Sequence, residues 1–61
     1  MNNWYEISLI KSEKSKIYVK GTASLEQAEN FKNEFLDAGL KVVIDEYVIK
    51  NEVPILVGEI K

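Results

Sequence analysis

SLEQAENFKNEFLDAGL, residues 24–40, carries the signals of a single amphipathic helix with both of its ends marked. Ser24 is a favourable N-cap, and Gln27 three residues later completes a capping-box pattern. Gly39, followed by an apolar residue, is typical of a Schellman C-terminus. The apolar residues between the caps recur at spacings that give one stripe for burial against a sheet: Leu25, Ala28, Phe31, Phe35 and Leu36. We therefore predict a helix over residues 25–38.

Two segments with alternating apolar residues precede this helix and predict a β-hairpin. Residues 4–10 (WYEISLI) and residues 17–20 (IYVK) lie on either side of the polar turn SEKS. Alternation with a period of two is typical of half-buried strands. The register that keeps the apolar side chains on one face predicts four cross-strand pairs: Glu6 with Lys20, Ile7 with Val19, Ser8 with Tyr18, and Leu9 with Ile17.

A long third strand follows the helix. Residues 40–50 (LKVVIDEYVIK) are rich in β-branched and aromatic side chains, which favour extended structure. Strict alternation along this strand would place Glu46 in the core. We therefore expect a bulge near residues 45–46, after which Tyr47 and Ile49 point inward.

The last strand completes a single domain. It covers residues 53–57 (VPILV), and Pro54 restricts it to an edge of the sheet. The element order is then ββαββ, which makes residues 1–61 one α+β domain. A right-handed crossover leaves room for the first strand between the second and the third. We predict a four-stranded antiparallel sheet of order 2-1-3-4 with the helix on one face; the alternative places the fourth strand against a second subunit.

The composition limits the chemistry of the chain. No Cys and no His occur among the 61 residues, so disulfides, ordinary zinc sites and the usual general bases are absent. The adjacent acids Asp45 and Glu46 would point to opposite faces of a strand, so they would not converge on a substrate. We therefore expect a protein that is not an enzyme and that has neither a cofactor nor a metal.

The small size makes self-association an expectation in its own right. A domain of this length has a thin stability margin and usually gains stability from disulfides, a metal or oligomerisation. Because the first two are excluded, a well-packed core, self-association or both remain, and we predict a homodimer. The apolar segment from Val53 to Val57 is the expected contact, since an exposed strand edge invites pairing with a second copy.

The charge balance argues against a nucleic-acid partner. Ten acids and eight bases give a net charge of −2, and every base is lysine. Nucleic-acid readers usually carry a basic surface that includes arginine. No apolar run approaches the roughly 20 residues of a membrane span, and the first residues do not resemble a signal peptide. The expectation is a cytoplasmic protein that binds no membrane.

Trp4, Ile10 and Tyr18 form the candidate partner-binding surface. In the predicted sheet they lie on the face that a single helix cannot cover, where polar residues would be expected. Trp and Tyr are enriched among the residues that dominate binding interfaces. The alternative is that Trp4 closes the end of the core beside the C-terminus of the helix.

Part of the chain resembles one half-repeat of a SPOR domain. The matching segments are IYVKGTAS (17–24), QAENF (27–31) and AGLKVVI (38–44). They are similar to that family's strand, G-[ST]-F-S-like turn, Ala-containing helix and Ala-Gly-hydrophobic turn. SPOR domains have two such halves and bind septal peptidoglycan glycan strands, so the resemblance implies a glycan-binding module. Only one of the two halves is present, and no binding residue is carried over.

The size and element order are also similar to those of small phage-encoded proteins that bind and inhibit host enzymes such as RNA polymerase. Together these features predict a small protein-binding module, and an inhibitor that occludes a host protein is its most specific form. The alternatives are a nucleic-acid-binding module that uses lysines on the sheet and a SPOR-like glycan binder.

Overall fold

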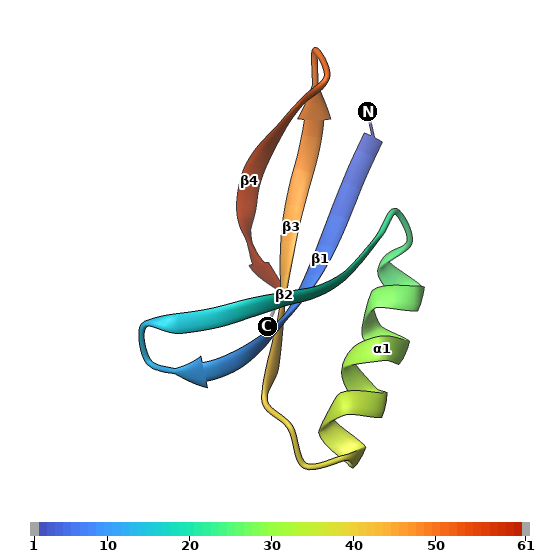
Figure 1. Ribbon diagram of the computed structural model, residues 1–61. Coiled ribbons are helices and arrows are strands. Elements are labelled where there is room, and N and C mark those ends of the chain that lie inside the picture. The colour runs from blue at the N-terminus through green and yellow to red at the C-terminus, as the bar shows by residue number, and fades with distance from the viewer. Residues whose placement is uncertain (1, 61) are drawn as a thin grey trace.

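The computed structural model describes residues 2–60 and contains one antiparallel sheet with one helix packed on it (Figure 1). The elements are β1 (Asn2–Ser12), β2 (Ser15–Thr22), α1 (Leu25–Asp37), β3 (Val42–Lys50) and β4 (Val53–Ile60). The strand order across the sheet is β2-β1-β3-β4. The predicted α+β fold, its ββαββ order and its sheet topology are therefore confirmed. None of the helices in the described residues is long and apolar enough to cross a membrane.

The N-terminus of α1 begins at the predicted residue but uses an additional hydroxyl group. The Ser24 side chain accepts a hydrogen bond from the backbone N–H of Gln27 (3.3 Å), as an N-cap does. The return bond of a capping box is replaced, because the Ser24 N–H donates to Oγ1 of Thr22 (3.1 Å). That hydroxyl donates in turn to the Gln27 side chain (3.0 Å). Thr22 at the end of β2 thus joins the strand to the helix cap.

The C-terminus of α1 ends in a Schellman motif, as the sequence predicts. Gly39 has a φ of 82°, a conformation that favours glycine. Its N–H donates to the carbonyl of Leu36 (2.9 Å), and the N–H of Leu40 donates to the carbonyl of Phe35 (3.0 Å). These bonds turn the chain sharply into β3.

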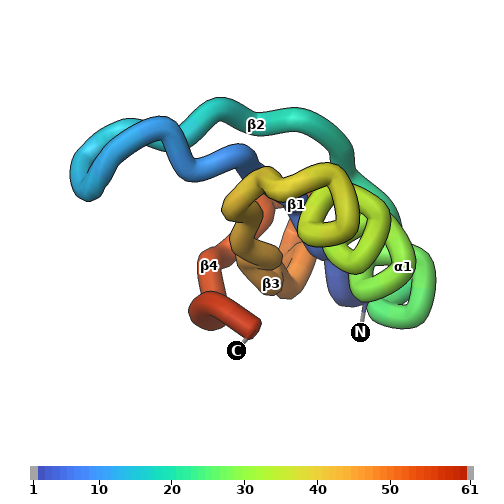
Figure 2. The backbone as a smooth tube through the Cα atoms, turned by 90° about the horizontal axis from the view of Figure 1, so that it is seen from below, coloured from blue at the N-terminus to red at the C-terminus, as the bar shows by residue number. Residues whose placement is uncertain are grey.

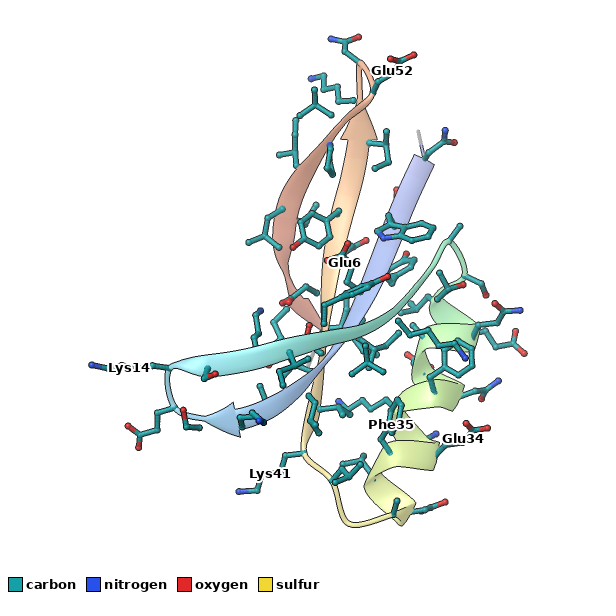
Figure 3. All side chains as sticks on the ribbon, in the orientation of Figure 1. Glu6, Lys14, Glu34, Phe35, Lys41 and Glu52 are labelled. Atoms are coloured by element: carbon teal, nitrogen blue, oxygen red, sulfur yellow. The ribbon has the colours of Figure 1, made fainter. Side chains whose placement is uncertain are left out.

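The core lies between α1 and the sheet face that the helix covers. Its buried members are Tyr5, Ile7, Ala28, Val42 and Ile44, with Leu9, Phe31, Phe35 and Ile60 packed around them. Phe35 points from the helix toward the sheet, whereas Glu34 points away from it (Figure 3). Leu25 and Leu36 are exposed, so the buried stripe of the helix is narrower than the sequence predicts.

The β1–β2 hairpin follows the predicted register only near its tip. Ser8 lies opposite Tyr18 and Leu9 opposite Ile17, as predicted. Beyond that point Val19 is an extra residue, so that Lys20 lies opposite Ile7 and Gly21 opposite Glu6. The predicted couples Glu6–Lys20 and Ile7–Val19 are therefore wrong.

The bulge has a consequence for the face that each β2 residue occupies. It carries Lys20 to the helix face, where its Nζ lies 4.0 Å from the centre of the Phe31 ring. Ile17 and Val19 are exposed rather than buried, because this part of β2 extends past the helix.

Strand β3 contains no bulge, which corrects the predicted orientation of its second half. It pairs with β1 without interruption from Val42 to Ile49, so Tyr47 and Ile49 lie on the face away from the helix. The irregularity falls instead in β4, where Val57 is the extra residue. Glu46 does lie on the helix face, and it remains half-buried and accepts a hydrogen bond from Nδ2 of Asn3 (2.8 Å). A carboxylate is tolerated there because it is only half-buried and one of its oxygens is hydrogen-bonded.

Candidate partner-binding face

No helix packs on the face of the sheet opposite α1 in residues 2–60, and we call it the open face. Ser8 and Asp45 near its centre are nevertheless buried. The strand registers assign its members. They are Trp4, Glu6, Ser8 and Ile10 from β1, Lys16, Tyr18 and Gly21 from β2, Val43, Asp45, Tyr47 and Ile49 from β3, and Pro54, Leu56 and Glu59 from β4. All three residues predicted to bind a partner lie on this face.

Trp4 and Tyr18 meet above Gly21. A Cβ atom at position 21 would lie 2.5 Å from Cζ2 of Trp4 and 2.9 Å from the hydroxyl oxygen of Tyr18. The missing side chain therefore provides the slot into which both aromatic side chains fit. Trp4 is half-buried, whereas Tyr18 is 56% exposed. Because Trp4 lies on the open face, it does not close the core beside the end of the helix.

Tyr47 extends this pair of aromatic residues across the sheet. It lies directly opposite Trp4 on the same face, where cross-strand side chains contact each other. We call Trp4, Tyr18 and Tyr47 the aromatic band. Sequence reasoning missed Tyr47 because it placed a bulge in β3; the unbroken alternation of Val43, Asp45, Tyr47 and Ile49 was the available signal.

Ile10 is separated from Trp4 but not from Tyr18. It lies opposite Lys16 near the tip of the hairpin and is half-buried. Glu6 and Ser8 separate it from Trp4 along β1. Tyr18 lies opposite Ser8, so Ile10 is its diagonal neighbour on the open face. The structure therefore brings Trp4 and Tyr18 together and places Ile10 on the far side of Tyr18.

An acidic row runs beside the aromatic band. Glu6 lies opposite Asp45, which in turn lies opposite Glu59, so one carboxylate from each of three neighbouring strands occupies this row. Glu6 lies near the middle of the sheet (Figure 3) and accepts a hydrogen bond from Nε1 of Trp4 (3.3 Å). Like charges placed directly opposite each other on a sheet are destabilising. The row therefore has an energetic cost in the isolated domain.

Lys16 neutralises one of these carboxylates and shows that the sheet is bent. Its Nζ lies 2.6 Å from Oδ2 of Asp45, and the two side chains are 52% and 10% exposed. The hydrogen bond to Asp45 raises the pKa of the Lys16 amine above its ordinary value of 10.5. In a flat sheet their Cα atoms would be about 16 Å apart, too far for this contact. The tip of the β1–β2 hairpin must therefore curl toward the open face, away from the helix (Figure 2).

A second exposed surface lies on the edge strand β4. Four of its large apolar side chains are 48–59% exposed. We call the four of them the apolar strip: Val53, Ile55, Leu56 and Val57. The edge position confirms what Pro54 predicts, since a proline cannot donate a ladder hydrogen bond.

Residues 2–60 contain no pocket and no group of acidic, Cys or His side chains that could hold a metal ion. Comparison with known protein families, with characterised proteins and with solved structures finds no match to this chain. The protein is thus a small α+β domain whose sheet carries its helix on one face only. On the other face, aromatic and acidic side chains lie side by side.

Proposed function

We propose that this protein is a non-enzymatic protein-binding module and that the aromatic band on the open face is its contact surface. The observation that carries the proposal is the slot at Gly21, which holds Trp4 together with the exposed Tyr18 on the face that carries no helix. Large aromatic side chains in such a position expose apolar area that usually marks an interaction surface. Trp and Tyr supply much of the binding energy where proteins associate.

The charges of the open face favour a protein over a nucleic acid. Within residues 2–60 its one base is Lys16, which is already paired with Asp45, whereas Glu6 and Glu59 leave this part of the face acidic. Phosphate groups would be repelled by these carboxylates. We propose that the module acts by occluding a surface of its partner, a host protein. We also propose that this binding takes place in the cytoplasm.

Affinity capture with matched variants tests the proposal. The protein is immobilised and exposed to a lysate of its source cells, and the captured proteins are quantified by mass spectrometry. Trp4→Ala with Tyr18→Ala should abolish capture of the specific partner, while Leu25→Ala with Leu36→Ala, which removes exposed apolar groups from the helix, should retain it. The reverse result would overturn the proposal. A cooperative thermal melt of each variant establishes that it is folded.

Homodimerisation is a second candidate function, and the apolar strip favours it. The isolated chain exposes 4613 Å², whereas a typical monomer of its 7.0 kDa mass exposes about 4,000 Å². The excess of about 600 Å² is somewhat less than the roughly 800 Å² that each partner contributes to a standard interface. The chain is also elongated, with extents of 37 × 25 × 17 Å. Both properties support the proposal that a second copy covers the apolar strip.

A further inference from the structure

We propose that the open face binds a basic segment of its partner, an extended stretch whose arginine or lysine side chains lie between the aromatic band and the acidic row. This inference rests on the proposed function, since it names the chemistry of the partner for the same face.

Two carboxylates of the acidic row form no salt bridge within residues 2–60. The row contains Glu6, Asp45 and Glu59, and Lys16 is the one base on this face in the part of the chain that the structure describes. The Asp45 carboxylate is nearly buried and bonded to Lys16, and Glu59 is attracted to the same amine without bonding it. Glu59 is exposed, and Glu6 is half-buried with only a long bond to Trp4.

Repulsion within the acidic row favours binding of a cation. Opposed carboxylates lower the stability of the free domain, so an arriving cation gains attraction and also relieves repulsion. The acidic row is therefore stabilising in a complex with a cation, whereas it is destabilising in the free protein. A neutral or acidic partner segment would gain nothing from it.

The aromatic rings of Trp4 and Tyr47 lie next to the acidic row. Trp4 lies two residues from Glu6 on β1, and Tyr47 lies two residues from Asp45 on β3, so each ring is the next side chain along the same face. A cation held by the carboxylates can thus lie against a ring, which attracts it further. The molecule already uses this type of contact on its other face, between Lys20 and Phe31. An arginine side chain satisfies both requirements, because its planar guanidinium bonds carboxylates and stacks on aromatic rings.

The single Trp of the chain makes the proposal measurable, because Trp4 belongs to the aromatic band. A short oligo-arginine peptide serves as the probe and an oligo-glutamate peptide of the same length as its control. Titration of the arginine peptide should change Trp4 fluorescence in a saturable way that weakens with added salt. The glutamate peptide should leave the fluorescence unchanged.

Charge-neutralising variants separate the open face from general electrostatics. Glu6→Gln with Glu59→Gln should weaken oligo-arginine binding by at least about tenfold, as the loss of charge-assisted hydrogen bonds predicts. Glu29→Gln with Glu34→Gln changes the net charge equally, on the exposed side of the helix, and should weaken binding less than about threefold. The open-face variant should melt close to the wild type, since the repulsion on Asp45 that it removes offsets the attraction between Glu59 and Lys16 that it loses.

Each other outcome has a definite meaning. Equal weakening by the two variants, or no saturable signal, would overturn the basic partner. If that happens while partner capture still depends on Trp4 and Tyr18, the protein-binding function stands without it. If capture is independent of both aromatic residues, the proposed function itself fails, and the partner assignment fails with it.

Discussion

Gly21 and Lys16 each determine a feature of the open face that a strand pattern does not contain. Gly21 provides space for Trp4 and Tyr18 because it has no side chain. Lys16 bonds the nearly buried Asp45 across two strands and so holds the hairpin in its curled shape. Both effects depend on one residue at one position, and both can be tested by substitution.

Gly21→Ala should displace the Trp4 indole, because the added methyl group would lie 2.5 Å from Cζ2 of that ring. We expect a loss of about 1–3 kcal/mol of stability, typical of overpacking, together with a shift in Trp4 emission. The cost should be smaller when the same change is made in a Trp4→Ala background, and urea denaturation of the four variants measures the difference. An equal cost in both backgrounds would mean that the slot does not hold Trp4.

Lys16→Met should lower stability at neutral pH by about 1 kcal/mol, because it leaves the Asp45 carboxylate without its partner while Lys16 itself is half exposed. The pKa of Lys16 is raised in the folded protein. The stabilisation is therefore fully present below the ordinary pKa of 10.5 and is lost as pH rises through the raised value. The free energies of unfolding of the wild type and of Lys16→Met, measured by urea denaturation, should therefore converge as the pH rises from neutral to values above 10.5. A constant gap across that range would contradict the role of the ion pair.

At the scale of elements, α1 is the part whose packing decides whether the domain folds. It covers β1, β2 and β3 on one face and supplies Ala28, Phe31 and Phe35 to the core or its border. Its two ends are fixed by local hydrogen bonds at Ser24 and Gly39.

Phe35→Ala should destabilise the domain by about 2–3 kcal/mol, less than for a fully buried phenylalanine because Phe35 is half-buried. Leu36→Ala, at the neighbouring position with an exposed side chain, should change stability by about 0.5 kcal/mol or less. Thermal and urea denaturation followed by circular dichroism measure both values. Similar effects of the two substitutions would mean that the helix faces the sheet differently.

The helix was predictable because its signals are local. A cap, an apolar stripe and a C-terminal glycine are read from residues close together in the sequence, and the strand order followed from connection rules. The bulges at Val19 and Val57 were not predictable in this way. Each adds one residue within a hairpin of consecutive strands, and the contacts that result, such as Gly21 beside Trp4, join residues that are not neighbours in the sequence. This is why Trp4 and Tyr18 were assigned to the candidate site and Tyr47 was not.

At the scale of the whole molecule, the domain has more exposed apolar surface than one helix can cover. The apolar strip runs along the β4 edge and shares only Leu56 with the open face. A single protomer can therefore contact a partner protein and a second copy of itself.

Ile55→Lys should dissociate the proposed homodimer, because it places a charge within the apolar strip. Sedimentation at high micromolar concentration should give a dimer for the wild type and a monomer for the variant. Val19→Lys, on the opposite edge strand, is the matched control and should leave the dimer intact. A wild type that sediments as a monomer under these conditions would rule out the homodimer and leave the open face as the one candidate interface.

The central claim is that the open face, and not the helix, contacts another protein. It is tested most directly by photocrosslinking in the source cells, with a photoreactive amino acid placed at Tyr18 on the open face or at Glu34 on the far side of the helix. We expect a covalent adduct with a second polypeptide, identified by mass spectrometry, from position 18 and none from position 34. Adducts that form only from position 34, or equally from both positions, would contradict the account.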